Sequence, residues 1–197
     1  MLFSIFSLLL VFVLNAAVQA APLNPVFKRR ATPAACFLTG KTALPAEVAN
    51  GIPALAKAVT CKSGNSVAGV PNVSSGGIDF KTIDFQQSTK SPLGFALATF
   101  TTPANPANAD LNKLQNQLND YLAVEAGVRS NGGGSILNKV KSAKFFLQFQ
   151  IARVNAAKGV PVSAGDTVEH QLEKVLKNAV GATASEIAQV NALAKVV

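Results

Sequence analysis

One apolar stripe limits the folds open to this chain more than any other feature of its sequence. The stripe consists of Leu111, Leu114, Leu118, Tyr121 and Leu122. Its members follow the 3.6-residue period that places side chains on one face of an α-helix. The opposite face carries Asn112, Lys113, Asn116, Asn119 and Asp120. Asp110 precedes the stripe as a candidate N-cap, and Asn131 opens a run of three glycines that ends it. The sequence therefore predicts a half-buried helix that begins at residue 110.

Apolar residues occur on every side of the next segment, residues 142–158. They are Phe145, Phe146, Leu147, Phe149, Ile151 and Val154. A helix that is apolar all round is typical of a fully buried position, so we expect this one at the centre of a helical bundle. The alternation from Leu147 to Ile151 suits a strand equally well, and both interpretations stay open. Gly159 and Pro161 end the segment.

Two capping signals near the C-terminus predict two further helices. Asp166 with Glu169, and Thr183 with Glu186, have the spacing of a capping box, in which each side chain bonds the other residue's backbone amide. Apolar residues at helical spacing follow both signals, and Gly181 separates the two helices.

The chain before residue 90 gives mixed signals. Residues 45–60 predict either one helix or a broken pair, because Gly51 and Pro53 interrupt the segment. Short β-favouring runs occupy residues 67–70, 78–80 and 83–85. We expect them to form a small β element near residues 67–86.

Ser91 and Pro92 form a helix start, with serine as the cap and proline at the first helical position. The apolar run at residues 93–100 that follows also has some strand character. The predicted fold class is mainly α: a bundle of about five helices with the small β element. The predicted secreted part, residues 31–197, has 167 residues, which is enough for one domain with a hydrophobic core.

The N-terminus has the pattern of a secretory signal peptide at residues 1–20. Its apolar run spans residues 2–14, which is shorter than the roughly 20 residues that cross a bilayer. Residues 21–30 resemble a short propeptide that ends at the dibasic pair Arg29 and Arg30. The alternatives are an uncleaved anchor and a solvated basic tail. We expect a secreted, extracellular protein with no transmembrane anchor after processing.

The two cysteines, Cys36 and Cys61, both follow the predicted processing site. An even number of cysteines in an oxidising compartment predicts one structural disulfide. The sequence Asn72-Val73-Ser74 is a glycosylation sequon between proline and glycine residues. We expect Asn72 to lie in an accessible loop and to carry a glycan.

The residues needed for common catalytic chemistry are scarce. His170 is the single histidine, so two-histidine metal sites are excluded. Asp79 and Asp84 are poorly spaced for a glycosidase pair. We therefore predict no catalytic residue, no metal and no cofactor. Removal of residues 1–30 lowers the formal net charge from +8 to +5, which weakens any case for nucleic-acid binding. The densest basic cluster comprises Lys139, Lys141, Lys144, Arg153 and Lys158. We expect it to be a solvated helix face, and contact with anionic lipid or wall polymer is the alternative.

Several segments resemble a group of small secreted proteins of filamentous ascomycete fungi. These segments are residues 36–40, 42–48, 91–97, 121–127 and 167–170. The resemblance implies a signal peptide, two cysteines and no assigned activity. Some fungal proteins of this kind act as effectors or elicitors on host plants. The group has no assigned functional residues, so none is carried over.

Three functional hypotheses follow. The first is a non-enzymatic secreted interaction protein of a fungus, a host-directed effector or elicitor, with a protein or cell-wall partner. The second is a carrier or binder of an apolar ligand, with Phe145, Phe146 and Phe149 lining a cavity inside the bundle; core packing explains these phenylalanines equally well. The third and most remote is a small secreted hydrolase.

Overall fold

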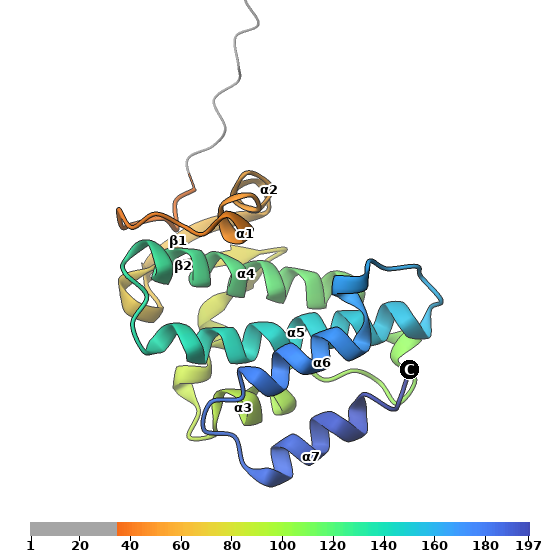
Figure 1. Cartoon of the computed structure of the whole chain (residues 1–197). Coiled ribbons are helices and arrows are strands. Elements are labelled where there is room, and N and C mark those ends of the chain that lie inside the picture. The colour runs from red at the N-terminus through yellow and green to blue at the C-terminus, as the bar shows by residue number, and fades with distance from the viewer. Residues whose placement is uncertain (1–34) are drawn as a thin grey trace, which may run out of the picture. The chain divides into compact units, whose positions relative to one another are not determined.

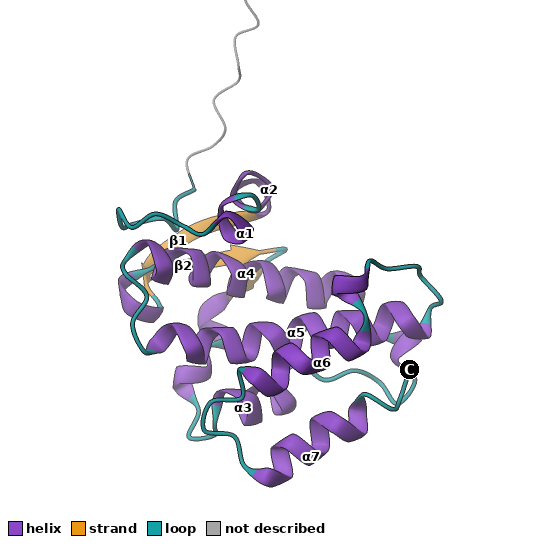
Figure 2. Cartoon of the chain, in the orientation of Figure 1, coloured by secondary structure: helices purple, strands orange, loops and turns teal. Residues whose placement is uncertain are grey.

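A computed structural model describes residues 35–197 of the chain (Figure 1). The predicted signal peptide (1–20) and the propeptide (21–30), with its dibasic site at Arg29 and Arg30, lie outside these residues. The described part is mainly helical with a small three-stranded antiparallel sheet (Figure 2), in agreement with the predicted class.

A broken pair of short helices begins the described fold, α1 (Ala46–Ala49) and α2 (Ile52–Ala58). Gly51 separates them, and Pro53 lies in the first turn of α2, where its missing amide hydrogen is not needed. The disulfide between Cys36 and Cys61 closes the loop that contains both helices, as the sequence predicted.

The sheet has the strand order β1-β2-β3. Its strands are β1 (Val59–Asn65), β2 (Pro71–Ser75) and β3 (Ile78–Asp79). In the β1–β2 pair Val59 lies opposite Ser75, and a bulge follows Cys61. Gly76 and Gly77, with φ of 56° and 82°, form the β2–β3 turn, because two successive positive φ angles suit a tight hairpin.

Of the three predicted strands, those at residues 67–70 and 83–85 are wrong. Val67–Gly69 forms a 3₁₀ turn, and residues 80–87 form two more, Phe80–Ile83 and Phe85–Gln87. Phe80 and Ile83 lie three positions apart and are both buried. A three-residue period brings both side chains to the same side, so the core is filled without a further strand.

The next two helices begin at their predicted caps. In α3 (Pro92–Thr99) the Ser91 hydroxyl accepts a hydrogen bond from the Gly94 amide at 2.9 Å. In α4 (Leu111–Ser130) the Asp110 carboxylate accepts one from the Lys113 amide at 2.9 Å. The apolar run at residues 93–100 is thus helical, as predicted, and the strand alternative is wrong.

The Phe-rich segment is helical, which decides between its two interpretations. It belongs to α5 (Ile136–Ala157), which begins six residues earlier than the predicted segment. This helix packs against α3, α4 and α6, and Phe146, Leu147 and Phe149 are fully buried. Figure 1 shows α4, α5 and α6 side by side.

The last two helices are α6 (Val168–Lys177) and α7 (Ala184–Leu193). The capping box of Thr183 and Glu186 is confirmed. The predicted cap at Asp166 is wrong, because the Thr167 hydroxyl caps α6 and Asp166 ends a preceding 3₁₀ turn.

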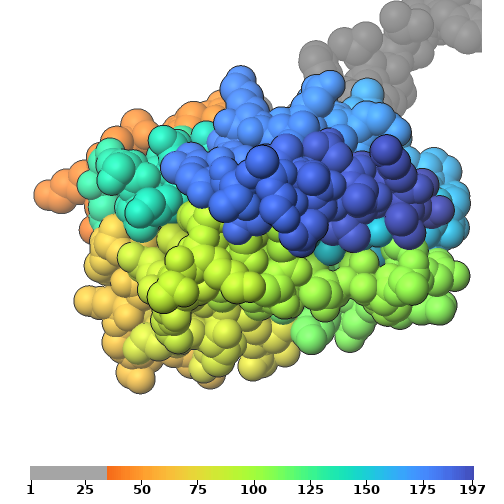
Figure 3. Space-filling view, turned by 90° about the horizontal axis from the view of Figure 1, so that it is seen from below, coloured from red at the N-terminus to blue at the C-terminus, as the bar shows by residue number. Residues whose placement is uncertain are grey.

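Helix α7 lies against α3. Glu186, at the start of α7, accepts a hydrogen bond from the Ser91 hydroxyl at 2.8 Å. Figure 3 shows the blue C-terminal helices across one face of the molecule, next to the yellow-green residues of α3.

Candidate ligand-binding groove

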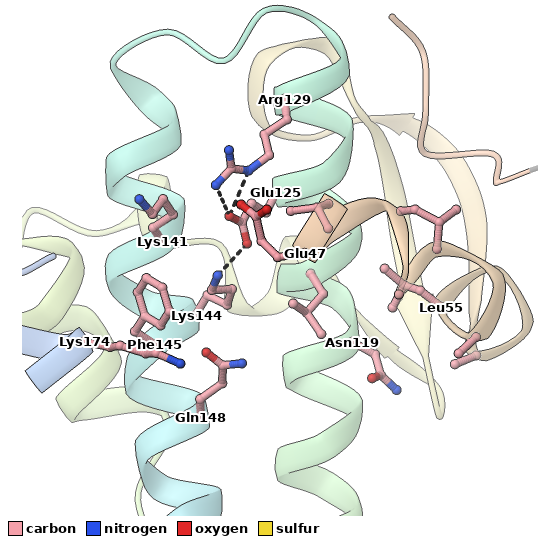
Figure 4. Close-up of a pocket in the computed structure, with 16 residues that line it drawn as sticks. Glu47, Leu55, Asn119, Glu125, Arg129, Lys141, Lys144, Phe145, Gln148 and Lys174 are labelled. Carbon is pink, nitrogen blue, oxygen red and sulfur yellow. Dashed lines mark hydrogen bonds and ion pairs between the residues drawn. The ribbon is translucent and has the colours of Figure 1, made fainter. Parts of the chain in front are cut away.

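A groove of about 640 Å³ lies between the α1–α2 segment and helices α4, α5 and α6 (Figure 4). Its volume falls within the roughly 300–1,000 Å³ range of small-molecule sites. The residues that line it come from positions 47 to 174, so the groove forms only when distant parts of the chain meet.

One wall of the groove is apolar. It is formed by Val48, Ile52, Ala54, Leu55, Ala58 and Leu122. Leu55 is buried and anchors α2, whereas Ala54 and Ala58 are exposed on the groove side. The small alanine side chains leave the space open, because a larger residue at either position would extend into it.

A buried ion-pair cluster forms the opposite part of the groove. Glu125, which is 2% exposed, accepts two hydrogen bonds from Arg129 at 2.9 and 3.1 Å. Its other carboxylate oxygen lies 2.7 Å from the Lys144 Nζ. Burial lowers the pKa of Lys144, and the charge of Glu125 raises it in part. The Glu125 carboxylate thus forms ion pairs with both Arg129 and Lys144.

Phe145 connects the ion-pair cluster to α6. The Lys144 Nζ lies 4.0 Å and the Lys174 Nζ 6.0 Å from the centre of its ring, within the range of cation–π attraction. Next to it, the Gln148 Oε1 is buried and has no hydrogen-bond partner within residues 35–197. A buried polar atom without a partner is uncommon in folded proteins.

The structure separates the three phenylalanines that the sequence predicted to line one cavity. Phe145 is half-buried and lines the groove. Phe146 and Phe149 lie fully inside the core, with ring centres 6.0 Å apart, and neither lines the groove. They are core residues because their side of α5 faces the other helices.

The basic cluster is not the solvated face that the sequence suggested. Lys139 and Lys158 are exposed, but Lys144 is 8% exposed and Arg153 only 1%. The spacing 139, 141, 144 is that of a helix surface, and sequence spacing alone does not reveal that another helix covers it. Lys141 lines the groove.

Asn72 does not lie in the accessible loop that we expected. It belongs to β2, is 4% exposed, and accepts a hydrogen bond from the Lys81 amide at 3.1 Å. Its glycosylation stays a prediction, and the burial means that a glycan would have to be attached before β2 folds.

The lone histidine lies apart from the groove. His170 is half-buried in the first turn of α6, and it forms no ion pair with Glu169 or Glu173 within the described residues. Across residues 35–197, no three His, Cys, Asp or Glu side chains lie close enough to hold a metal ion. Over the same residues, no helix has the length and apolar character needed to cross a bilayer.

The described residues form a mainly helical, disulfide-linked protein with a groove that is apolar on one side and cationic on the other. The chain belongs to the family described as "Domain of unknown function (DUF7143)", whose model matches residues 38–197. That range includes every element of the groove. Comparisons with curated proteins and with solved structures found no match.

Proposed function

We propose that this protein is an extracellular, non-enzymatic binding protein that holds a small apolar ligand in the groove between α2 and α5. The observation that carries the proposal is the groove itself, about 640 Å³ in volume with an apolar wall. Most ligand sites have such apolar walls and a few well-placed polar groups. The ligand would contact Phe145 but not Phe146 or Phe149.

An extracellular location agrees with the disulfide and with the signal-peptide pattern. Disulfides persist in oxidising compartments and are rare in the cytosol, and Cys36 and Cys61 are bonded. The resemblance to small secreted fungal proteins suggests a setting in which the protein acts on a host as an effector or elicitor. We also retain as proposals the helical bundle, centred on α5, and the absence of catalytic turnover.

A neutral fluorescent dye tests the groove directly. Nile red should bind the purified protein saturably with one-to-one stoichiometry. The variant Ala54→Trp fills the groove from the exposed side of α2, so it should weaken binding by at least about tenfold. The matched control Ala188→Trp places the same side chain on an exposed position of α7 and should bind as the parent does.

Two results would contradict the proposal. One is the lack of saturable binding by a correctly folded protein, as judged by circular dichroism. The other is equal binding by Ala54→Trp and the parent, which would place the dye elsewhere. Recovery of the protein from culture medium, and turnover assays on polysaccharides and lipids, test the secretion and the predicted lack of activity.

A further inference from the structure

The groove contains more positive than negative charge. Its cationic side chains are Arg129, Lys141, Lys144 and Lys174, and its carboxylates are Glu47 and Glu125. Glu125 is fully engaged by Arg129 and Lys144. Within residues 35–197, Lys141 and Lys174 form no ion pair, and Glu47 is exposed to solvent. Lys141 and Lys174, both half-buried residues, therefore line the groove without a carboxylate partner among residues 35–197.

The surroundings of these lysines favour a negatively charged group. Lys144 is 8% exposed, and its Nζ and that of Lys174 both lie within 6.0 Å of the centre of the Phe145 ring. Attraction between charges increases when water is excluded from around them. The unpartnered side-chain amide of Gln148 lies beside the same ring, and an amide can turn its NH₂ group toward an anion.

The apolar wall lies across the groove from these cations. In Figure 4 the lysines and Phe145 project from α5 and α6, and Leu55 projects from α2 on the other side. A ligand that spans the groove would meet positive charge at one end and aliphatic side chains at the other. This arrangement is complementary to an amphiphile with a negative head.

We propose that the ligand is an amphiphile with one alkyl chain and an anionic head group. The head group lies at Lys141, Lys144 and Lys174, and the chain lies along Ile52, Leu55 and Leu122. This inference rests on the proposed function, because it names the chemistry of the ligand in the same groove.

A series of ligands with the same twelve-carbon chain tests the head group. Displacement of Nile red is measured with dodecanoate, dodecyl phosphate, dodecanol and dodecyltrimethylammonium, each below its micelle-forming concentration. The two anions should bind at least about tenfold more tightly than dodecanol, and the cation should bind most weakly. The order of dodecanoate and dodecyl phosphate tells which anion the lysines prefer.

Two lysine variants test whether the preference for an anionic head group depends on the lysines of the groove. The double variant Lys141→Gln with Lys174→Gln should lose about tenfold in dodecanoate affinity and leave dodecanol affinity unchanged. The control Lys139→Gln with Lys177→Gln removes the same charge from exposed positions of α5 and α6. It should keep the parent's selectivity.

The outcomes separate the two proposals. Equal affinity for all four head groups, with Nile red still bound in the groove, would overturn the anionic ligand and leave the groove as an apolar site. Equal losses in the groove variant and the control would assign the effect to net charge and also overturn it. A failure of every ligand and of Nile red to bind would overturn the proposed function itself.

Discussion

Two carboxylates on α4 are buried in different surroundings. Glu125 has two cationic partners, whereas both oxygens of Asp120 lack a hydrogen-bond partner within the described residues. Burial, and then the negative charge of Asp79, raise the pKa of Asp120 from 3.8 to about 8. The sequence placed Asp120 on the polar face of the helix, but it is fully buried because β2 and β3 also pack on α4.

Asp120 should make the stability of the protein depend on pH. Between pH 3.8 and about 8 the folded chain holds this proton and the unfolded chain does not. The free energy of unfolding therefore falls as pH rises through that window. Asp120→Asn keeps a neutral group, so it should be more stable than the parent by at least about 1 kcal/mol at pH 8.

Urea denaturation between pH 4 and pH 8.5 checks this prediction. The difference between variant and parent should grow as pH rises and nearly vanish at pH 4. Glu173→Gln, an exposed substitution on α6, should show no such trend. A constant difference at every pH would mean that Asp120 is ionised throughout.

A glycine near the C-terminal end of α4 marks a close contact between elements. A Cβ atom at Gly127 would lie 2.6 Å from the Phe37 carbonyl oxygen and 2.7 Å from the Val70 methyl carbons. Helix propensity alone predicts that Gly→Ala stabilises by about 1 kcal/mol. We expect the opposite for Gly127→Ala, a loss of about 1–3 kcal/mol, because the helix and its neighbours must separate.

Thermal and chemical unfolding measure the effect of this substitution. Gly165→Ala is the control, because the nearest atom to its Cβ lies 3.8 Å away. It should change stability by less than about 0.5 kcal/mol. A stabilised Gly127→Ala variant would show that α4 does not approach the N-terminal segment this closely.

Arg153 on α5 holds the end of the chain in place. Its guanidinium donates to the carbonyl oxygens of Leu193 and Val196 at 2.7 and 2.9 Å, and to Gln150 at 2.6 Å. Positive charge at the C-terminal end of a helix is favourable. Arg153→Met keeps the length of the side chain and leaves these acceptors without a donor, so it should destabilise by about 2–4 kcal/mol.

Urea denaturation and hydrogen exchange of α7 test this role. The amides of α7 should exchange faster in Arg153→Met, and the exposed control Lys158→Met should behave as the parent does. Unchanged protection of α7 would show that the helix docks without the arginine.

Local signals predicted the helices well and the strands poorly. The caps at Asp110, Ser91 and Thr183 bond amides three positions away, so they are visible in a short stretch of sequence. Strand β1 was missed because its second half, Lys62–Asn65, is polar and exposed. It is a strand because β2 pairs with it, and such pairing depends on contacts that propensity does not encode.

At the scale of the whole molecule, the groove was the feature that sequence could least predict. The sequence predicts Phe145 as a ligand contact and places Lys141 and Lys144 in a basic cluster. Their meeting with α2 and Lys174 depends on how four helical segments pack. The sequence of any one of these segments does not indicate how it packs against the other three.

The disulfide should affect both stability and binding. Cys36 and Cys61 are separated by 25 positions, so replacing both with serine should cost about 3 kcal/mol in the chain-entropy description. Because the loop they close carries every residue of the apolar wall except Leu122, Nile red affinity should fall as well. Treating the parent with dithiothreitol should reproduce both losses in denaturation and dye titrations. Unchanged affinity at reduced stability would show that the wall forms without the bridge.

The disulfide-closed loop, residues 36–61, would make the proposed ligand binding depend on the redox state of the surroundings. Glutathione in a cell's interior reduces accessible disulfides, whereas the extracellular space preserves them. Taken together, the proposed secretion and the predicted loss of affinity on reduction imply that the protein would keep its ligand outside cells and release it in a reducing compartment. Loading and delivery would then be governed by the redox state of the compartment, with no need for a second ligand or a dedicated release factor.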